Sequence, residues 1–184
     1  MRAIPNMTVI TVADAVETKK AVFAIADHQG PVYLRLSRAA APVYYSEDMK
    51  FEIGKGITVR DGRDVTIITT GTVLHKALAA AELLEAKGIQ ARVVDMHTIK
   101  PIDEELIIEC ARETGAIVTV EEHSVCGGLG SAVAEVLAEH MPVPMTRIGA
   151  TDFAESGDYE QLLVKYGYGP ESIAERCAEV IKRK

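Results

Sequence analysis

The stretch VTVEEHSVCGGLGSAVAEVLAEH, residues 118–140, passes from β-branched residues through a glycine pair into an amphipathic segment. β-Branched residues favour a strand, and apolar residues spaced three and four apart predict a helix over residues 131–140. A strand, a glycine turn and a helix in this order form the unit from which parallel α/β sheets are built. This stretch therefore decides the fold class, and its turn is the first place to look for a binding site.

The turn at Gly127, Gly128, Gly130 and Ser131 is open to more than one interpretation. Backbone N–H groups and the positive end of a helix dipole would converge there, which is a common way to bind phosphate or carboxylate. The dinucleotide fingerprint G-x-G-x-x-G is only half present, because Val133 stands where the last small residue belongs. The simpler interpretation is a sharp turn with close helix packing. An anion site at the four turn residues is the alternative hypothesis.

Neither a nucleophile nor a metal site is assigned around this turn. Cys126 precedes the expected helix and follows His123 by three residues, a setting that can lower a thiol pKa. Spacing in sequence establishes no contact, and an unpaired cysteine is more often a small buried hydrophobe. Glu121 and Glu122 are adjacent in a strand and point to opposite faces, which makes a poor metal site. The three cysteines are odd in number and widely spaced, so we expect free thiols.

The chain after residue 50 continues the alternation of strands and helices. It begins with a strand, an Asp-Gly turn and a second strand, which predicts an antiparallel hairpin. Gly88 and Gly115 are expected to end two helices, and Pro170 to begin the last one. The pattern predicts an α/β fold of three layers, α/β/α, whose mixed sheet of about five strands has one antiparallel edge strand.

A single βαβ unit precedes this region, with strands at residues 7–11 and 31–36 and a helix that Thr11 is expected to cap. Two parallel strands and one helix cannot cover both faces of a sheet. We therefore expect both strands to carry unpaired edges and an uncovered apolar face. Residues 37–50 show no periodicity and are interpreted as a linker.

Composition and charge exclude several classes of protein. Hydrophobic residues make up 48% of the chain but aromatic residues only 5%, so the core must be aliphatic, as in buried parallel strands. The formal net charge of −7 is spread along the chain, which argues against binding to nucleic acid or to an anionic membrane. No apolar run reaches the roughly 18 residues of a membrane helix, and the first residues have no signal-peptide pattern. We expect a cytoplasmic protein.

Two arginines follow the second strand, in YLRLSRAAAP at residues 33–42. Ligands of α/β proteins gather at the carboxyl ends of strands, and a planar guanidinium suits phosphate. Arg35 and Arg38 are therefore candidate phosphate ligands, and a pair of solvated linker arginines is the alternative. Among the histidines, His97 is also kept as a candidate because it stands at a strand end.

Five segments together resemble the C-terminal section of a transketolase, in particular the split kind made from two polypeptides. They are IPNMTVITVADAVET, GPVYLRLSR, VVDMHTIKPID, VTVEEHSVCGGLGSAVAE and TDFAESGDYEQLLVKYG. The resemblance covers nearly the whole chain, and it is specific through the order and number of the motifs. 1-Deoxyxylulose-5-phosphate synthase and the beta subunit of 2-oxoacid dehydrogenases share the EEH corner and are the alternative families.

The resemblance implies a division of the chain and a place for the cofactor. Residues 1–38 are similar to the last βαβ unit of a pyrimidine-binding domain, residues 39–50 to a linker, and residues 51–184 to the transketolase C-terminal domain. In this family the glutamate that activates the cofactor, the histidine cluster for the acceptor and the segment that holds magnesium and diphosphate belong to parts that this sequence does not resemble. We therefore expect thiamine diphosphate and magnesium in the complete enzyme, none on this chain alone, and no activity of the isolated chain.

The resemblance also implies an activity, which is the transfer of a two-carbon ketol unit between sugar phosphates in the pentose phosphate pathway. Arg38 matches the arginine that ends the LSR motif and contacts the substrate phosphate, and Arg35 is the weaker candidate. The expected partners are an N-terminal section, a second copy in a dimer, and sugar phosphates. The glycine turn matches a segment without a catalytic group. A non-catalytic assembly or anion-binding module is the alternative function.

Overall fold

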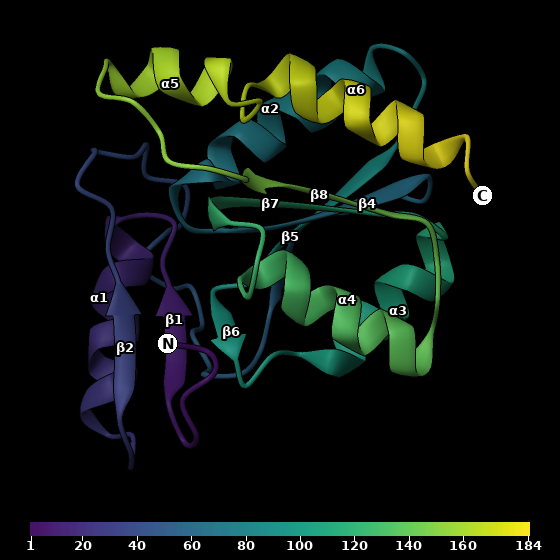
Figure 1. Ribbon diagram of the computed structural model, residues 1–184. Coiled ribbons are helices and arrows are strands. Elements are labelled where there is room, and N and C mark those ends of the chain that lie inside the picture. The colour runs from purple at the N-terminus through teal and green to yellow at the C-terminus, as the bar shows by residue number, and fades with distance from the viewer.

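The computed structural model describes residues 1–184 and contains two β-sheets with helices around them (Figure 1). The strands are β1 (Thr8–Thr11), β2 (Val32–Arg35), β3 (Ile57–Arg60), β4 (Val65–Thr70), β5 (Ala91–Asp95), β6 (Thr98–Lys100), β7 (Ile117–Ser124) and β8 (Met145–Ala150). The helices are α1 (Ala15–Ala26), α2 (Leu74–Glu85), α3 (Glu104–Thr114), α4 (Leu129–His140), α5 (Tyr159–Lys165) and α6 (Pro170–Ile181), with a 3₁₀ turn η1 (Gly71–Val73) before α2.

The larger sheet has five strands in the order β3-β5-β4-β7-β8, and helices cover both of its faces (Figure 1). Strands β5, β4, β7 and β8 are parallel, and only the edge strand β3 is antiparallel. Successive residues of β4 enter opposite layers: Ile67 packs in the cluster with α2 and α6, and Ile68 packs in the cluster with α3 and α4. The expected three-layer fold class is confirmed.

The expected hairpin between the first two strands of this sheet is wrong. β3 pairs antiparallel with β5, from Ile57 opposite Asp95, and β4 lies on the far side of β5. The Asp-Gly segment crosses the start of β5, where the N–H groups of Arg63 and Asp64 donate to the carbonyl of Gln90 at 3.1 and 2.9 Å. All six residues of β4 are buried, as expected for the central strand of the sheet, and β3 lies at the edge.

The N-terminal βαβ unit is confirmed, because β1 and β2 are parallel, but β1 has a second neighbour. β6 pairs antiparallel with β1, so a three-stranded sheet of order β2-β1-β6 forms. The expectation of an unpaired edge is therefore wrong for β1, whose four residues are all buried, and it holds for β2, which is an edge strand. β6 has only three residues, TIK, and showed no periodicity from which it could be predicted.

The cap of α1 is Asp14 and not Thr11. One carboxylate oxygen of Asp14 accepts from the N–H of Glu17 at 2.8 Å. The other accepts from the N–H groups of Tyr44 and Tyr45 at 2.7 and 2.8 Å, so the linker is fastened to the start of the helix. Thr11 instead ends β1. An aspartate caps a helix through its side chain and can bind further donors, which explains why this acid is buried.

Other local expectations agree with the structure. Gly115 ends α3 with φ of 66°, and Pro170 is the first residue of α6. The three cysteines are free, with Cys126 exposed and the other two buried. None of the helices combines the length and the apolar character that crossing a membrane requires.

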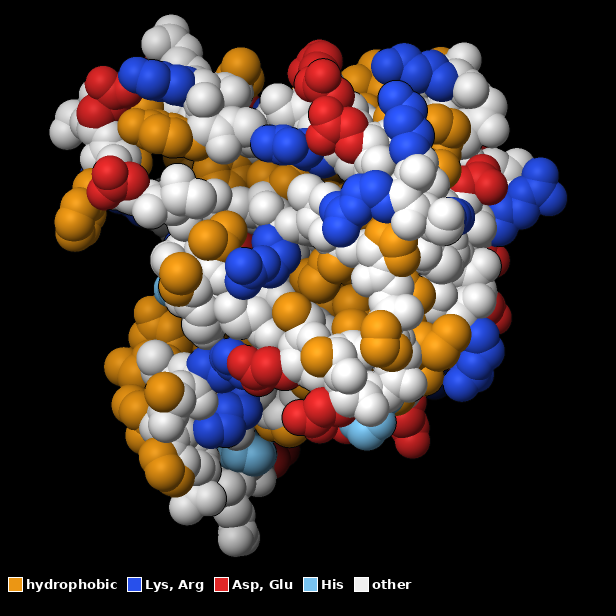
Figure 2. Space-filling view, turned by 45° about the vertical axis from the view of Figure 1, so that its right-hand side comes forward, with side chains coloured by type: hydrophobic (Ala, Val, Ile, Leu, Met, Phe, Trp, Pro, Cys, Tyr) orange, Lys and Arg blue, Asp and Glu red, His pale blue; other side chains and the backbone are white.

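The surface carries both signs of charge and one apolar area. On the face shown in Figure 2, basic and acidic side chains are interspersed. Hydrophobic side chains gather at the lower left of that view, in the part that holds the N-terminal unit, and others lie near its centre. Val22 and Phe23 of α1 are 50% and 65% exposed, so this helix buries only its other side.

Candidate functional site at the carboxyl ends of the strands

The carboxyl ends of β1, β2, β4 and β7 meet beside two small hollows. The first has a volume of about 140 Å³, and its polar lining consists of Arg2, Thr11, Arg35, Thr70, Glu121 and His123. The second has a volume of about 110 Å³ and shares Thr11, Arg35 and Thr70 with the first, while Ser37, Arg38 and Glu122 are added. Both lie where ligands of α/β proteins bind.

Arg35 and Arg38 have different roles in the structure. Arg35 is half-buried, and its Nη2 donates to the backbone carbonyl of Glu122 at 2.6 Å, which ties β2 to β7. Arg38 is exposed at the second hollow, and its guanidinium makes no hydrogen bond or ion pair with the protein. Arg35 is therefore not a solvated linker residue, whereas Arg38 has all its donors available.

Glu122 belongs to the second hollow and is held by two hydroxyl groups. Tyr159 Oη donates to Glu122 Oε2 at 2.9 Å, and Thr72 Oγ1 donates to the same oxygen at 3.3 Å. Burial, together with the Glu122 carboxylate, raises the pKa of Tyr159 to about 12. Tyr159 lies in α5, a helix that we did not predict, although Asp158 followed three residues later by Gln161 is a capping signature that indicates one.

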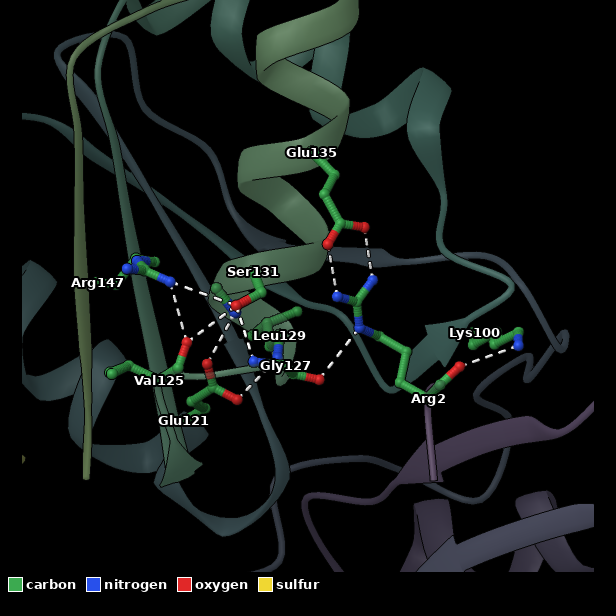
Figure 3. A network of polar contacts seen from close by, with 10 residues as sticks. Arg2, Lys100, Glu121, Val125, Gly127, Leu129, Ser131, Glu135 and Arg147 are labelled. Atoms are coloured by element: carbon green, nitrogen blue, oxygen red, sulfur yellow. Dashed lines mark hydrogen bonds and ion pairs between the residues drawn. The ribbon is translucent and has the colours of Figure 1, made fainter. Parts of the chain in front are cut away.

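The glycine turn holds a carboxylate of the chain itself (Figure 3). Glu121 is 1% exposed, and its two oxygens accept from the N–H groups of Leu129 and Gly130, each at 2.7 Å. Burial raises the pKa of Glu121, and the two N–H donors act in the opposite direction. A helix N-terminus favours a negative group, and at α4 the carboxylate of Glu121 on β7 is that group. Gly128 leaves the space, because a Cβ there would lie 2.0 Å from Glu121 Oε2.

The remaining polar groups of the turn are also used inside the chain. Ser131 Oγ accepts from the N–H of Gly127 and donates to the carbonyl of Val125, each at 2.9 Å. Arg147 donates to the same carbonyl at 2.9 Å. The geometry of Gly127, Gly128, Gly130 and Ser131 is therefore that of a tight corner. Whether an external anion also binds there stays a prediction.

The N-terminal segment is fastened to this corner from outside. Arg2 Nε donates to the carbonyl of Gly127 at 3.1 Å, and its two terminal nitrogens donate to the two oxygens of Glu135 at 2.6 Å (Figure 3). Lys100 of β6 donates to the carbonyl of Arg2 at 3.0 Å. These contacts cross from the segment before β1 to α4, so two parts of the chain distant in sequence line the first hollow together.

Cys126 and His97 do not form part of a reactive group. The ring Nδ1 of His123 pairs with the carbonyl of Ser124 at 3.0 Å, and Cys126 is held only through its own N–H. His97 is fully buried and lines neither hollow. Its Nδ1 pairs with Thr98 Oγ1 at 2.9 Å, and its ring stacks on Phe51 with centroids 4.1 Å apart.

We expect His97 to make the protein less stable in acid. Burial lowers the pKa of His97 to about 4, so the neutral ring stabilises the fold above the unfolded pKa of about 6.5, and this stability is lost as the pH falls through 4. The loss should approach about 3 kcal/mol, from two to three pKa units at 1.4 kcal/mol each. Urea unfolding at pH 7 and pH 4.5 measures it. Replacing His97 by Gln should remove this part of the acid sensitivity, whereas the exposed control His140→Gln should retain it.

The fold and the site define an α/β domain with a mixed sheet and a phosphate-sized hollow at its carboxyl edge. Residues 54–173 match the family described as transketolase, C-terminal domain. The chain belongs to this family.

Individual relatives agree with this assignment. The chain is 47% identical to a putative transketolase C-terminal section from Methanocaldococcus jannaschii, over 100% of this chain and 58% of that protein. It is 42% identical to a 1-deoxy-D-xylulose-5-phosphate synthase from Syntrophotalea carbinolica, over 95% of this chain and 28% of that protein. A solved split-gene transketolase, described as an inactive β4 tetramer, superposes with a TM-score of 0.96 at 48% identity and covers 99% of this chain. The chain spans 58% and 60% of the two split relatives.

Proposed function

We propose that this chain is the C-terminal section of a split, thiamine-diphosphate-dependent transketolase that transfers a two-carbon ketol unit between sugar phosphates. Within that enzyme, its contribution to substrate binding is a phosphate contact through Arg38. The observation that carries this proposal is the guanidinium of Arg38, which lies at the second hollow without any partner in the protein. Its partners would be the N-terminal section, as a separate polypeptide, and a second copy of the complex.

The chemistry around Arg38 supports binding of a phosphate group. A guanidinium can pair two N–H donors with two phosphate oxygens, and such charge-assisted bonds are the stronger kind. Arg35, fixed on the carbonyl of Glu122, adds a second positive charge to the lining of the same hollow. A volume of about 110 Å³ has room for a phosphate group but not for a whole sugar phosphate, so the sugar would have to lie outside this hollow.

The two hollows at the carboxyl edge are too small for the cofactor. Ligand pockets commonly have volumes of about 300–1,000 Å³, whereas the two hollows at the carboxyl edge have about 140 and 110 Å³. No group of three or more His, Cys, Asp or Glu side chains is placed to hold a metal ion. In the proposed enzyme, thiamine diphosphate and magnesium would be bound by the N-terminal section.

The division of the chain is part of the same proposal. Residues 1–38 would be the last βαβ unit of the pyrimidine-binding domain, residues 39–50 the linker, and residues 51–184 the C-terminal domain. The exposed edge of β2 and the exposed side chains Val22 and Phe23 on α1 support this division, because both would be covered by the remainder of that domain.

The test replaces Arg38 by Ala in the complete enzyme, with this chain and its N-terminal section combined. Losing a charge-assisted pair of about 1.5–3 kcal/mol should lower kcat/KM for a phosphorylated aldose acceptor by about 10- to 100-fold, mainly through KM. The same aldose without its phosphate should be affected much less. Arg63→Ala, at an exposed position in the turn before β4, is the matched control and should leave both values unchanged. An equal effect on both acceptors would mean that Arg38 has a structural role.

A further inference from the structure

Two acidic side chains are fully buried where α1, the linker and β5 meet. Glu17 lies in the first turn of α1, Asp95 ends β5, and both are 0% exposed. Glu17 Oε2 accepts from the N–H of Ala13 at 2.5 Å, and Asp95 Oδ2 accepts from the hydroxyl of Tyr45 at 2.8 Å. Neither acid forms an ion pair with a basic side chain, so nothing in the protein neutralises them.

The second oxygen of each carboxyl group lacks a hydrogen-bond donor. Glu17 Oε1 and Asp95 Oδ1 are buried without a hydrogen-bond partner when both groups are ionised. One buried network joins the two acids: the carboxylate of Asp14 accepts from the N–H groups of Glu17 and Tyr45, and the hydroxyl of Tyr45 donates to Asp95. Two carboxylates can only accept, and they repel each other, whereas one added proton turns the pair into a donor and an acceptor and satisfies both oxygens.

The groups around the two acids disfavour a second negative charge. On α1, Asp14 adds another negative charge that faces both acids. From the linker, Tyr45 faces the pair through its hydroxyl and Tyr44 stacks edge-on against Tyr45, with ring centroids 5.1 Å apart. Leaving two unpaired charges in such a place would cost several kcal/mol.

We propose that Glu17 and Asp95 share one proton, and that their hydrogen bond is a pH-sensitive latch that fastens α1 and the linker to the five-stranded sheet. Burial, followed by the charge of Asp95, raises the pKa of Glu17, and burial raises the pKa of Asp95. Acids with raised pKa values contribute stability that is fully present below the unfolded pKa of about 4 and is lost as the pH rises through the folded values. The latch is therefore closed in acid and at neutral pH and opens in alkali.

When the hydrogen bond between Glu17 and Asp95 is lost, the contacts of the linker should weaken first. Tyr45 holds Asp95 through its hydroxyl, and the backbone N–H groups of Tyr44 and Tyr45 donate to Asp14. A second negative charge at Glu17 would lie beside both of these contacts. The segment after Arg38 would then loosen at a pH that leaves the sheet itself intact.

The experiment uses the 184-residue chain and the variant Glu17→Gln. The amide of Gln can donate permanently to Asp95 and accept from Ala13, so no proton is needed. Urea unfolding from pH 6 to pH 9 should lower the folded-to-unfolded ratio of the unchanged chain by tenfold or more, and that of Glu17→Gln by less than threefold. Glu175→Gln, at an exposed position of α6, is the matched control and should behave as the unchanged chain does. Amide exchange of Tyr44 and Tyr45 should accelerate above the intrinsic pH effect only where Glu17 is present.

Two results would overturn the proposal. One is a Glu17→Gln variant that folds and shows the same pH dependence as the unchanged chain. If that variant does not fold, a carbon NMR titration of the carboxyl groups in the unchanged chain decides the question. The carboxyl carbon of Glu17 should then be that of a protonated acid at pH 7, and a midpoint between pH 4 and 5 would refute the shared proton.

Discussion

Replacing Glu121 by Ala is expected to lower the free energy of unfolding by about 4 kcal/mol. The substitution leaves the N–H groups of Leu129 and Gly130 buried without an acceptor, at about 1–3 kcal/mol each. It also removes the negative charge at the start of α4 and leaves a small cavity. Urea unfolding at pH 7 measures the change.

Glu122→Ala is the matched control for this prediction. Glu122 is the next residue on the same strand, on the opposite face, and its carboxylate is bound only by the hydroxyl groups of Tyr159 and Thr72. Replacing Glu122 by Ala should lower the free energy of unfolding by about 1 kcal/mol. If Glu121→Ala costs no more than Glu122→Ala, the carboxylate is not an important cap.

The Glu121→Ala variant also tests whether the glycine corner can bind an external anion. With the internal carboxylate gone, phosphate could take its place on the same two N–H groups. Phosphate at 100 times its Kd should then raise the free energy of unfolding of the variant by about 2.7 kcal/mol. The same concentration should change the free energy of unfolding of the unchanged chain little. No restoration would mean that Gly127, Gly128, Gly130 and Ser131 form a structural corner alone.

Gly62→Ala should be the most damaging single substitution that we consider. A Cβ at this position would lie 2.3 Å from the carbonyl carbon of Ala91 and 2.4 Å from the nitrogen of Arg92. These are backbone atoms of β5, which is paired with β3 on one side and β4 on the other, so they cannot move aside. We expect a loss of more than about 4 kcal/mol, which for a chain of this size lowers the Tm by roughly 10 °C or more.

The control for Gly62→Ala is Gly169→Ala. The nearest atom to a Cβ at Gly169 is 3.6 Å away, and φ is −66°, which any residue adopts. Thermal unfolding of the two variants compares them directly, and Gly169→Ala should shift the Tm by only a few degrees. A small shift for Gly62→Ala would show that the turn before β4 can lift away from β5.

The fold class could be predicted because its signals are local. Each of these signals can be read from a few neighbouring residues. Examples are the buried strand β4, the left-handed Gly115 that ends α3, and Pro170 at the start of α6. The partner of β3 could not be predicted in the same way. An Asp-Gly pair favours a hairpin locally, but the competition for the centre of the sheet is decided by strands far along the chain. β6 was missed for the same reason, since its partner lies about ninety residues earlier.

The candidate site was predicted in its parts but not in its contacts. Alternation along the strand correctly placed Glu121 and Glu122 on opposite faces, whereas the external anion that the helix N-terminus suggested stays a prediction. That the anion is Glu121 itself depends on the depth of the glycine turn, which only the three-dimensional structure shows. Position at the strand end alone did not separate Arg35 from Arg38, and in the structure a backbone carbonyl of β7 binds Arg35 only.

The pairing of β1 with β6 has a consequence for folding during synthesis. β1 ends at Thr11, but the strand that closes its open side begins at Thr98. The βαβ unit is complete at Arg35, so at a synthesis rate of roughly 5–20 residues per second its β1 edge stays unpaired for about 3–13 seconds before Thr98 is made. During this interval a neighbouring nascent chain could pair with β1 in place of β6. We therefore expect the translation speed between these two strands to affect the yield of folded protein.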